Sequence, residues 1–167
     1  MRPTTFALLA ILLLMPTAVL ALEPPNGPVL LRVSGQIEVT NVGDEAHFDR
    51  EMLQTLPQRE TVTGTPWHNG AQRFSGPLGR ALLDAVGARG DVLRITALND
   101  YAASVPVDDL RDYDVIFAMS RNGTPLRVRD QGPLFLIYPF DEHPHLLNEE
   151  VLARSVWQIA SVHVGDH

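Results

Sequence analysis

The feature that most limits the possible folds is a series of short apolar segments, each bounded by residues typical of turns. Such segments are typical of β-strands, and they occur at residues 29–39, 92–98, 115–119, 126–129, 134–138 and 156–164. Gly35 falls inside the first segment and indicates a bulge or bend there. The dipeptide Asn122-Gly123 lies between the third and fourth segments and predicts a tight hairpin turn.

Helix-like segments are fewer and shorter. Residues 49–56 begin at Asp49, which can cap a helix, and residues 77–86 carry one apolar stripe followed by Gly87, a natural cap for the C-terminus of a helix. Residues 108–112 could form one further helical turn. Because these helices are inserted between distant strands, we predict an α+β fold, a mainly β domain with two or three short helices.

The first residues read as a targeting segment. Arg2 gives a positive start, residues 6–15 are almost entirely apolar, and Val19 and Ala21 suit the minus-three and minus-one positions of a cleavage site. We predict a signal peptide over residues 1–21 and a single domain over residues 22–167, exported to the periplasm and not inserted in the membrane after cleavage. An uncleaved anchor is the alternative, although the apolar run is short of the roughly 20 residues that span a bilayer.

Charge and cysteine content exclude several classes of function. Without Arg2, 12 basic and 20 acidic residues give the predicted mature domain a net charge of about −8. A protein that binds nucleic acid needs a basic face, so that class is excluded. The chain has no cysteine, which removes thiolate nucleophiles and cysteine-ligated metals, and an exported domain without disulfides must be held together by burial alone.

Few polar residues suggest a site by themselves. Trp67 lies among small and turn-forming residues in TVTGTPWHNG and could be a plug of the core or the floor of a binding site; His68 could contact a ligand or face water. His143 and His145 in EHPHLL could face one ion, but no third ligand is close in sequence, so a polar surface loop is the better interpretation and no metal site is predicted. Asp100 follows a strand directly, where it could form a turn or belong to a site.

The order of several motifs resembles the molybdopterin-binding fold of sulfite-oxidase-type oxidoreductases. The motifs are FSGPLGRALLDAVGA, ALNDYAASVPVDDL, the hairpin at NGTPL, DQGPLFLIYP and SVWQIASVHV, and together they cover residues 29–164. In such enzymes a cysteine thiolate holds molybdenum shortly before the first of these motifs, where this chain has Thr63, Gly64, Thr65, Pro66 and Trp67. Threonine is a neutral, hard ligand and cannot replace a thiolate.

A second resemblance is closer. The segments FDREML, TPW, ALNDYA, GPLFLIYP and SVWQ are similar to those of periplasmic pterin-binding proteins, which share this fold but lack the metal cysteine. The resemblance implies a non-catalytic protein that binds a reduced pterin and passes its status to the periplasmic domain of a membrane-bound cyclic di-GMP cyclase or phosphodiesterase, which controls surface attachment and biofilm formation. No tightly bound cofactor is then expected.

The pterin-binding resemblance implies a set of ligand-binding residues and no catalytic ones. We expect the Asp100 carboxylate, with Asn99 beside it, to accept from the amino group and ring N–H of the pterin. Trp67 is the expected stacking platform. The remaining candidates would close the other face or donate to the ring carbonyl or a hydroxylated tail; they are Tyr101, Tyr138, Arg129 and Arg73. The alternatives are a molybdopterin-dependent periplasmic oxidoreductase and a periplasmic partner or sensor for another small ligand.

Overall fold

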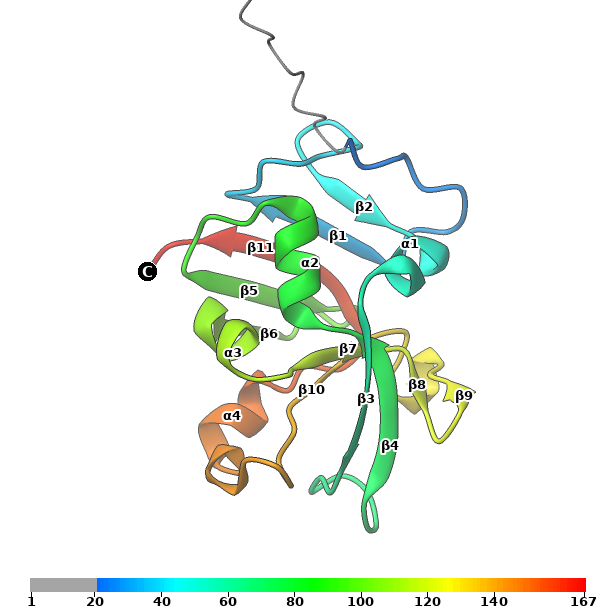
Figure 1. The fold of residues 1–167 in the computed structure, drawn as a ribbon, viewed down its shortest axis with the longest axis vertical. Coiled ribbons are helices and arrows are strands. Elements are labelled where there is room, and N and C mark those ends of the chain that lie inside the picture. Colours follow the sequence, from blue (N-terminus) through cyan, green and yellow to red (C-terminus); the bar gives the residue numbers. More distant parts are fainter. Residues whose placement is uncertain (1–20) are drawn as a thin grey trace, which may run out of the picture.

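A computed structural model describes residues 21–167. The predicted signal peptide, except for Ala21, lies outside these residues and stays a prediction. The largest sheet has five strands in the order β2-β1-β11-β5-β6 (Figure 1). Strands β1 and β11 run parallel, and the other neighbours are antiparallel. The strands are β1 (Leu31–Gly35), β2 (Ala46–Phe48), β5 (Val92–Ala97), β6 (Ala102–Pro106) and β11 (Ile159–Gly165).

Two smaller sheets complete the β structure. A four-stranded sheet has the order β3-β4-β8-β9, and its β3–β4 hairpin extends away from the five-stranded sheet (Figure 1). A two-stranded ribbon of β7 and β10 lies beside β4, joined to it by the bond from the Met119 N–H to the Ser75 carbonyl, 2.8 Å. The bounds are β3 (Gln58–Thr63), β4 (Gln72–Pro77), β7 (Ile116–Ala118), β8 (Ser120–Arg121), β9 (Thr124–Pro125) and β10 (Phe135–Ile137).

Four α-helices occur in the described part of the chain, one more than the upper end of the prediction. They are α1 (Arg50–Thr55), α2 (Gly79–Val86), α3 (Val107–Asp112) and α4 (Glu149–Arg154), with short 3₁₀ segments at η1 (Val128–Asp130) and η2 (Pro144–Leu146). Helix α2 covers one face of the five-stranded sheet (Figure 1) and buries Leu82, Leu83 and Val86. The predicted α+β, mainly β class is confirmed.

The β7–β10 ribbon is buried on both faces and separates two apolar clusters. Alternate side chains of a strand point to opposite faces, and here Phe117 and Leu136 join the main core under the five-stranded sheet. Ile116 and Phe135 point the other way, into a smaller cluster against which Trp67 packs. The ribbon therefore carries the core of the protein on one side and the surroundings of Trp67 on the other.

Several local predictions are confirmed. Asp49 caps α1 by accepting from the Met52 N–H at 2.9 Å, and Gly87 ends α2 with a left-handed φ of 59°. Asn122 and Gly123 have φ of 52° and 79°, as required by the tight turn that joins β8 to β9. Gly35 has a φ of 88°, and a Cβ there would lie 2.0 Å from the Val164 carbonyl oxygen, so only glycine fits.

Other local predictions are wrong. The strand expected at 126–129 is replaced by a loop and η1, because the chain turns through Gln131, whose φ is 73°. Helix α2 begins at Gly79 and not at residue 77, because Pro77 still pairs with Gln58 in the β3–β4 ladder. Six strands and a helix of the described residues were not predicted, because they are short or have polar or small residues on exposed faces: β2, β3, β4, β6, β8, β9 and α4.

Candidate functional site

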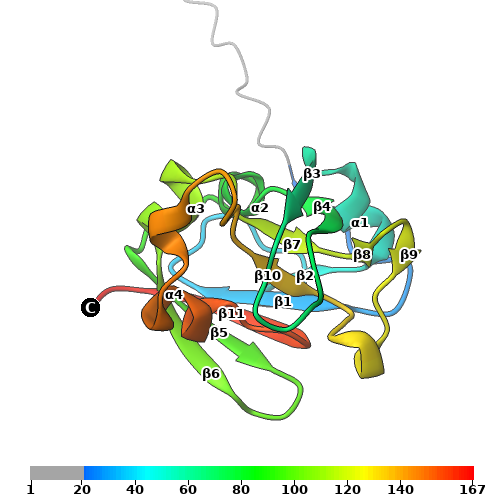
Figure 2. The ribbon, with the colours of Figure 1, turned by 90° about the horizontal axis from the view of Figure 1, so that it is seen from below.

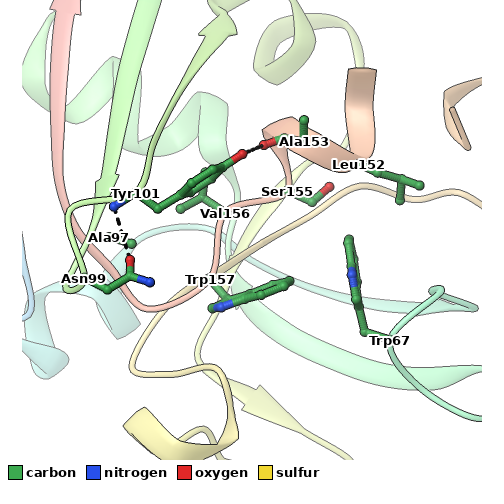
Figure 3. Close-up of a pocket in the computed structure, with 9 residues that line it drawn as sticks. All are labelled: Trp67, Ala97, Asn99, Tyr101, Leu152, Ala153, Ser155, Val156 and Trp157. Carbon is green, nitrogen blue, oxygen red and sulfur yellow. Dashed lines mark hydrogen bonds between the residues drawn. The ribbon is translucent and has the colours of Figure 1, made fainter. Parts of the chain in front are cut away.

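The candidate site is a cavity of about 410 Å³ at the end of the five-stranded sheet (Figure 3). The β5–β6 turn forms one wall, helix α4 and the segment that follows it form the second, and the loop after β3 brings in Trp67 as the third. The lining residues are Trp67, Ala97, Asn99, Tyr101, Leu152, Ala153, Ser155, Val156 and Trp157. Most of these side chains are apolar or aromatic, and the few polar groups come from Asn99, Tyr101 and Ser155, an arrangement typical of sites for small organic ligands.

Two tryptophans set the shape of this cavity. The Trp67 and Trp157 rings lie edge to face, with centroids 5.5 Å apart and planes at 80°. Both rings also contact Phe135 of the buried ribbon, at 5.7 and 5.8 Å. Trp157 is 36% exposed. Trp67 therefore packs on the edge of the smaller core and also lines the cavity.

The β5–β6 turn supplies the polar groups. Asn99 accepts from the Tyr101 backbone N–H through its side-chain oxygen at 3.2 Å, which leaves the amide nitrogen turned toward Trp157 (Figure 3). The Tyr101 hydroxyl donates to the Ala153 carbonyl at 2.8 Å and so links the turn to the end of α4. Asp100 holds the turn with a φ of 66° and is exposed; it does not line the cavity.

The structure brings Trp67, Asn99 and Tyr101 together, and it places the other four predicted residues elsewhere. Asp100 forms the turn. Arg73 is exposed on β4 and pairs with Glu60 at 3.2 Å, and Arg129 is exposed on η1, 3.9 Å from Asp130.

Tyr138 is fully buried in the main core, where its hydroxyl donates to Asp109 at 2.8 Å. Burial, and after it the Asp109 carboxylate, raise the pKa of the Tyr138 hydroxyl far above its ordinary value of 10. The alternation along β10 explains the position, since Tyr138 lies on the face of that segment opposite to Phe135.

Sequence reasoning did not select Trp157, Ser155 or the α4 residues as site residues. Trp157 could have been found, because it occurs within the SVWQ motif next to polar residues. Ser155 is 2% exposed and donates to the Val151 carbonyl at 2.9 Å, so it fixes the end of α4. Trp157, Ser155 and the α4 residues reach the β5–β6 turn because α4 packs against β6 (Figure 2). Periodicity in one sequence does not predict this packing.

His68 lies behind Trp67 and connects three separate segments. Its Nδ1 lies 2.7 Å from the Thr65 hydroxyl, and its Nε2 contacts Gln131 at 2.8 Å and the Arg121 guanidinium. A guanidinium can only donate and the Gln131 Oε1 atom can only accept, so Arg121 favours the neutral ring of His68 and Gln131 favours the ring with a proton on Nε2. Burial, and after it the positive Arg121, lower the pKa of His68 below its ordinary value of 6.5, against the opposing hydrogen bond to the Gln131 oxygen.

The lowered pKa of His68 predicts a stability loss on acidification. The unfolded chain binds a proton at His68 near pH 6.5, whereas the folded protein binds it only at a lower pH, so stability falls as the pH drops below about 6.5. We expect the free energy of unfolding, measured by chemical denaturation, to decrease less between pH 7 and pH 5 for His68→Gln than for the wild type. His163→Gln, on the exposed side of β11, is the control, and an unchanged pH dependence in His68→Gln would contradict the assignment.

The described residues do not fit a molybdenum centre of the sulfite-oxidase type. The chain has no cysteine to provide the thiolate, and Thr63 and Thr65, in the segment that resembles the thiolate position, are buried hydroxyls. Within residues 21–167 no group of three or more His, Cys, Asp or Glu could hold a metal ion. The rings of His143, His145 and Tyr113 contact one another in edge-to-face or tilted geometry, with centroids 5.0 to 5.9 Å apart.

No helix in residues 21–167 is long and apolar enough to cross a membrane.

Comparison with known proteins gives one result for the family. The model of a family described as the oxidoreductase molybdopterin binding domain matches residues 36–141. This segment includes Trp67, Asn99 and Tyr101, whereas α4 and Trp157 lie beyond its end. No curated protein is similar enough to the chain to count as a relative.

Proposed function

The chain belongs to the family of oxidoreductase molybdopterin-binding domains, and we propose that it binds a reduced pterin in the cavity beside Trp157 without catalysing a reaction on it. Membership of the family supports a pterin- or molybdopterin-related protein. The finer assignment, a pterin without molybdenum, rests on the missing thiolate and on the chemistry of the cavity.

The observation that carries this proposal is the perpendicular pair of tryptophans. A flat bicyclic ring can stack on the Trp157 face while one of its edges meets the face of Trp67. Stacking of a nucleobase on an aromatic side chain contributes roughly 1–3 kcal/mol, and a pteridine ring has a comparable π-face. The free amide nitrogen of Asn99 can donate to a ring nitrogen or carbonyl at the same time.

We further propose that the protein is periplasmic and reports pterin binding to a membrane-bound cyclic di-GMP cyclase or phosphodiesterase. The resemblance of FDREML, TPW, ALNDYA and SVWQ to periplasmic pterin-binding proteins supports this part. The rim of the cavity also supports it, because Tyr101 and Trp157 line the cavity and are both exposed, so that a partner in contact with them could detect a bound ligand.

Spectroscopy and metal analysis of the purified protein test the proposal. If a pterin is bound on purification, the denatured protein should release it, and fluorescence would detect it. In a titration with 7,8-dihydroneopterin, the protein should bind one molecule per chain. Stoichiometric molybdenum would overturn the proposal in favour of an oxidoreductase. Absence of both metal and pterin binding would overturn the proposal and favour a periplasmic partner of a membrane protein or a sensor for another small ligand.

Exchange of the polar groups in the β5–β6 turn tests the position of the ligand. Asn99→Ala removes the amide that faces the cavity, and we expect about five- to tenfold weaker binding of 7,8-dihydroneopterin by calorimetry, the loss typical of one hydrogen bond. Asp100→Asn is the matched control, because asparagine tolerates the positive φ at this position and the side chain lies outside the cavity. If Asp100→Asn weakens the binding and Asn99→Ala leaves the affinity unchanged, Asp100 and not Asn99 anchors the ligand.

A further inference from the structure

A second cavity, of about 420 Å³, adjoins the first between strand β6 and helix α4. Tyr101 and Ala153 line both cavities. The hydrogen bond from the Tyr101 hydroxyl to the Ala153 carbonyl, 2.8 Å, closes the space between the strand and the helix, and Tyr101 is 48% exposed. The two cavities are therefore separated by one half-exposed side chain and a single hydrogen bond.

The free edge of β6 borders the second cavity. Strand β6 is the last strand of the five-stranded sheet. In an antiparallel pair the hydrogen-bonded positions alternate, and the Ala97 N–H bonds to the Tyr101 carbonyl. Since Ala103 and Val105 then bond toward β5, the N–H and C=O groups of Ala102 and Ser104 point away from it. Ser104 adds an exposed hydroxyl, so this wall offers both donors and acceptors.

The electrostatics of the second cavity disfavour an anion. Among its described lining residues, Arg154 is the only one with a permanent positive charge, and that charge is already paired. Its guanidinium donates to Asp109 at 3.1 Å and also pairs with Glu150. No Lys or Arg of residues 21–167 lines the first cavity. A carboxylate or phosphate placed here would meet the Glu150 carboxylate without gaining a free cation.

We propose that the two cavities form one binding site, in which the first holds the ring and the second holds an uncharged, hydroxylated side chain of the same ligand. This inference rests on the proposed function and names the class of pterin. Sites for drug-sized ligands occupy roughly 300–1,000 Å³, so the first cavity, of about 410 Å³, lies near the lower end of that range, and the second, of about 420 Å³, adds room for a side chain on the ring. Hydroxyls both donate and accept, which matches the edge of β6, whereas pterins with carboxylate or phosphate tails are disfavoured.

Calorimetric titration with three dihydropterins tests the inference. The probes are 6-methyl-7,8-dihydropterin, which has no tail, 7,8-dihydroneopterin, which has an uncharged trihydroxypropyl tail, and 7,8-dihydrofolate, which has a carboxylated tail. We expect the second probe to bind at least about tenfold more tightly than the other two, as for a tail that gains one or two net hydrogen bonds.

Reversal of one charge tests the cause of the selectivity. Glu150→Arg removes the acidic neighbour and adds a cation to the second cavity, so we expect dihydrofolate to bind at least about threefold more tightly at low salt, with a smaller gain at 0.5 M salt because exposed charges are screened. Glu149→Arg is the matched control, since it makes the same charge change one residue earlier in the first turn of α4 without lining the cavity.

The outcomes separate the two proposals. If the tail-free and hydroxylated probes bind with equal affinity, the second cavity does not hold the tail, and only this inference fails. If dihydrofolate binds the wild type as tightly as dihydroneopterin, the proposed selectivity for an uncharged tail is wrong, and again only this inference fails. If the gain for dihydrofolate is the same in Glu150→Arg and Glu149→Arg, the charge of this cavity does not set the selectivity. If none of the three probes binds, the proposed function fails and this inference fails with it.

Discussion

Replacement of Trp157 by alanine is expected to weaken the binding of 7,8-dihydroneopterin by at least about tenfold, the effect of losing one aromatic stacking partner. Trp157 is the lining aromatic best placed to stack a flat ring, because it is 36% exposed while its other contacts are edge-to-face with Trp67 and Phe135. Calorimetry is the suitable measurement, since the substitution also removes one of the two tryptophans that a fluorescence titration would report.

Two further variants separate stacking from folding. Trp157→Phe keeps an aromatic face and should recover most of the affinity. Trp67→Ala should weaken binding as well, but with a lower thermal midpoint, because the Trp67 ring packs on the smaller core through Phe135. Equal affinities of Trp157→Ala and the wild type would show that the ring does not stack there.

The same variant connects binding to the proposed signalling role. If pterin binding is what a membrane partner detects, cells in which the wild-type chain is replaced by Trp157→Ala should have the cyclic di-GMP level and surface attachment of cells that lack the protein. Cells carrying Asp100→Asn should behave as wild type. A defect in binding that leaves both cellular properties unchanged would separate the pterin site from the relay.

The sequence predicted the parts of the fold that depend on neighbours along the chain. The cap at Asp49, the turn at Asn122-Gly123 and the left-handed cap at Gly87 each need only a few adjacent residues. The predicted strand at 126–129 failed because the alternation of Arg127, Val128 and Arg129 is as compatible with an exposed loop as with a strand.

The site was predicted less completely than the fold, because its walls come from distant segments. The turn at residues 99–101 was recognised, but which of Asn99 and Asp100 faces the cavity depends on a single positive φ, and that φ exposes Asp100. Tyr138 looked suitable by residue type, yet the alternation of side chains along β10 and the residue after it turns Tyr138 toward Asp109. The contribution of α4 and Trp157 depends on how the last part of the chain packs, for which a single sequence has no local signal.

The second large effect concerns Gly76, near the C-terminal end of β4. A Cβ at this position would lie 2.0 Å from the Phe117 carbonyl oxygen and 2.8 Å from its carbonyl carbon. Both are backbone atoms of the buried β7–β10 ribbon, so no side chain can rotate away to make room. Gly76→Ala must push β4 from β7, and we expect a loss of about 3 kcal/mol or more in the free energy of unfolding, as for severe overpacking of a core.

Denaturant unfolding of Gly76→Ala beside Gly64→Ala measures this cost. A Cβ at Gly64 would meet only the Asp141 carboxylate oxygen at 3.5 Å, an ordinary contact, so Gly64→Ala should stay close to wild type. Because the ribbon that Gly76 abuts carries Phe135, which contacts both Trp67 and Trp157, the surviving folded fraction of Gly76→Ala should also bind dihydroneopterin more weakly. Equal stability of the two variants would mean that β4 and β7 can separate without cost, and the ribbon would then not be what fixes the two tryptophans in place.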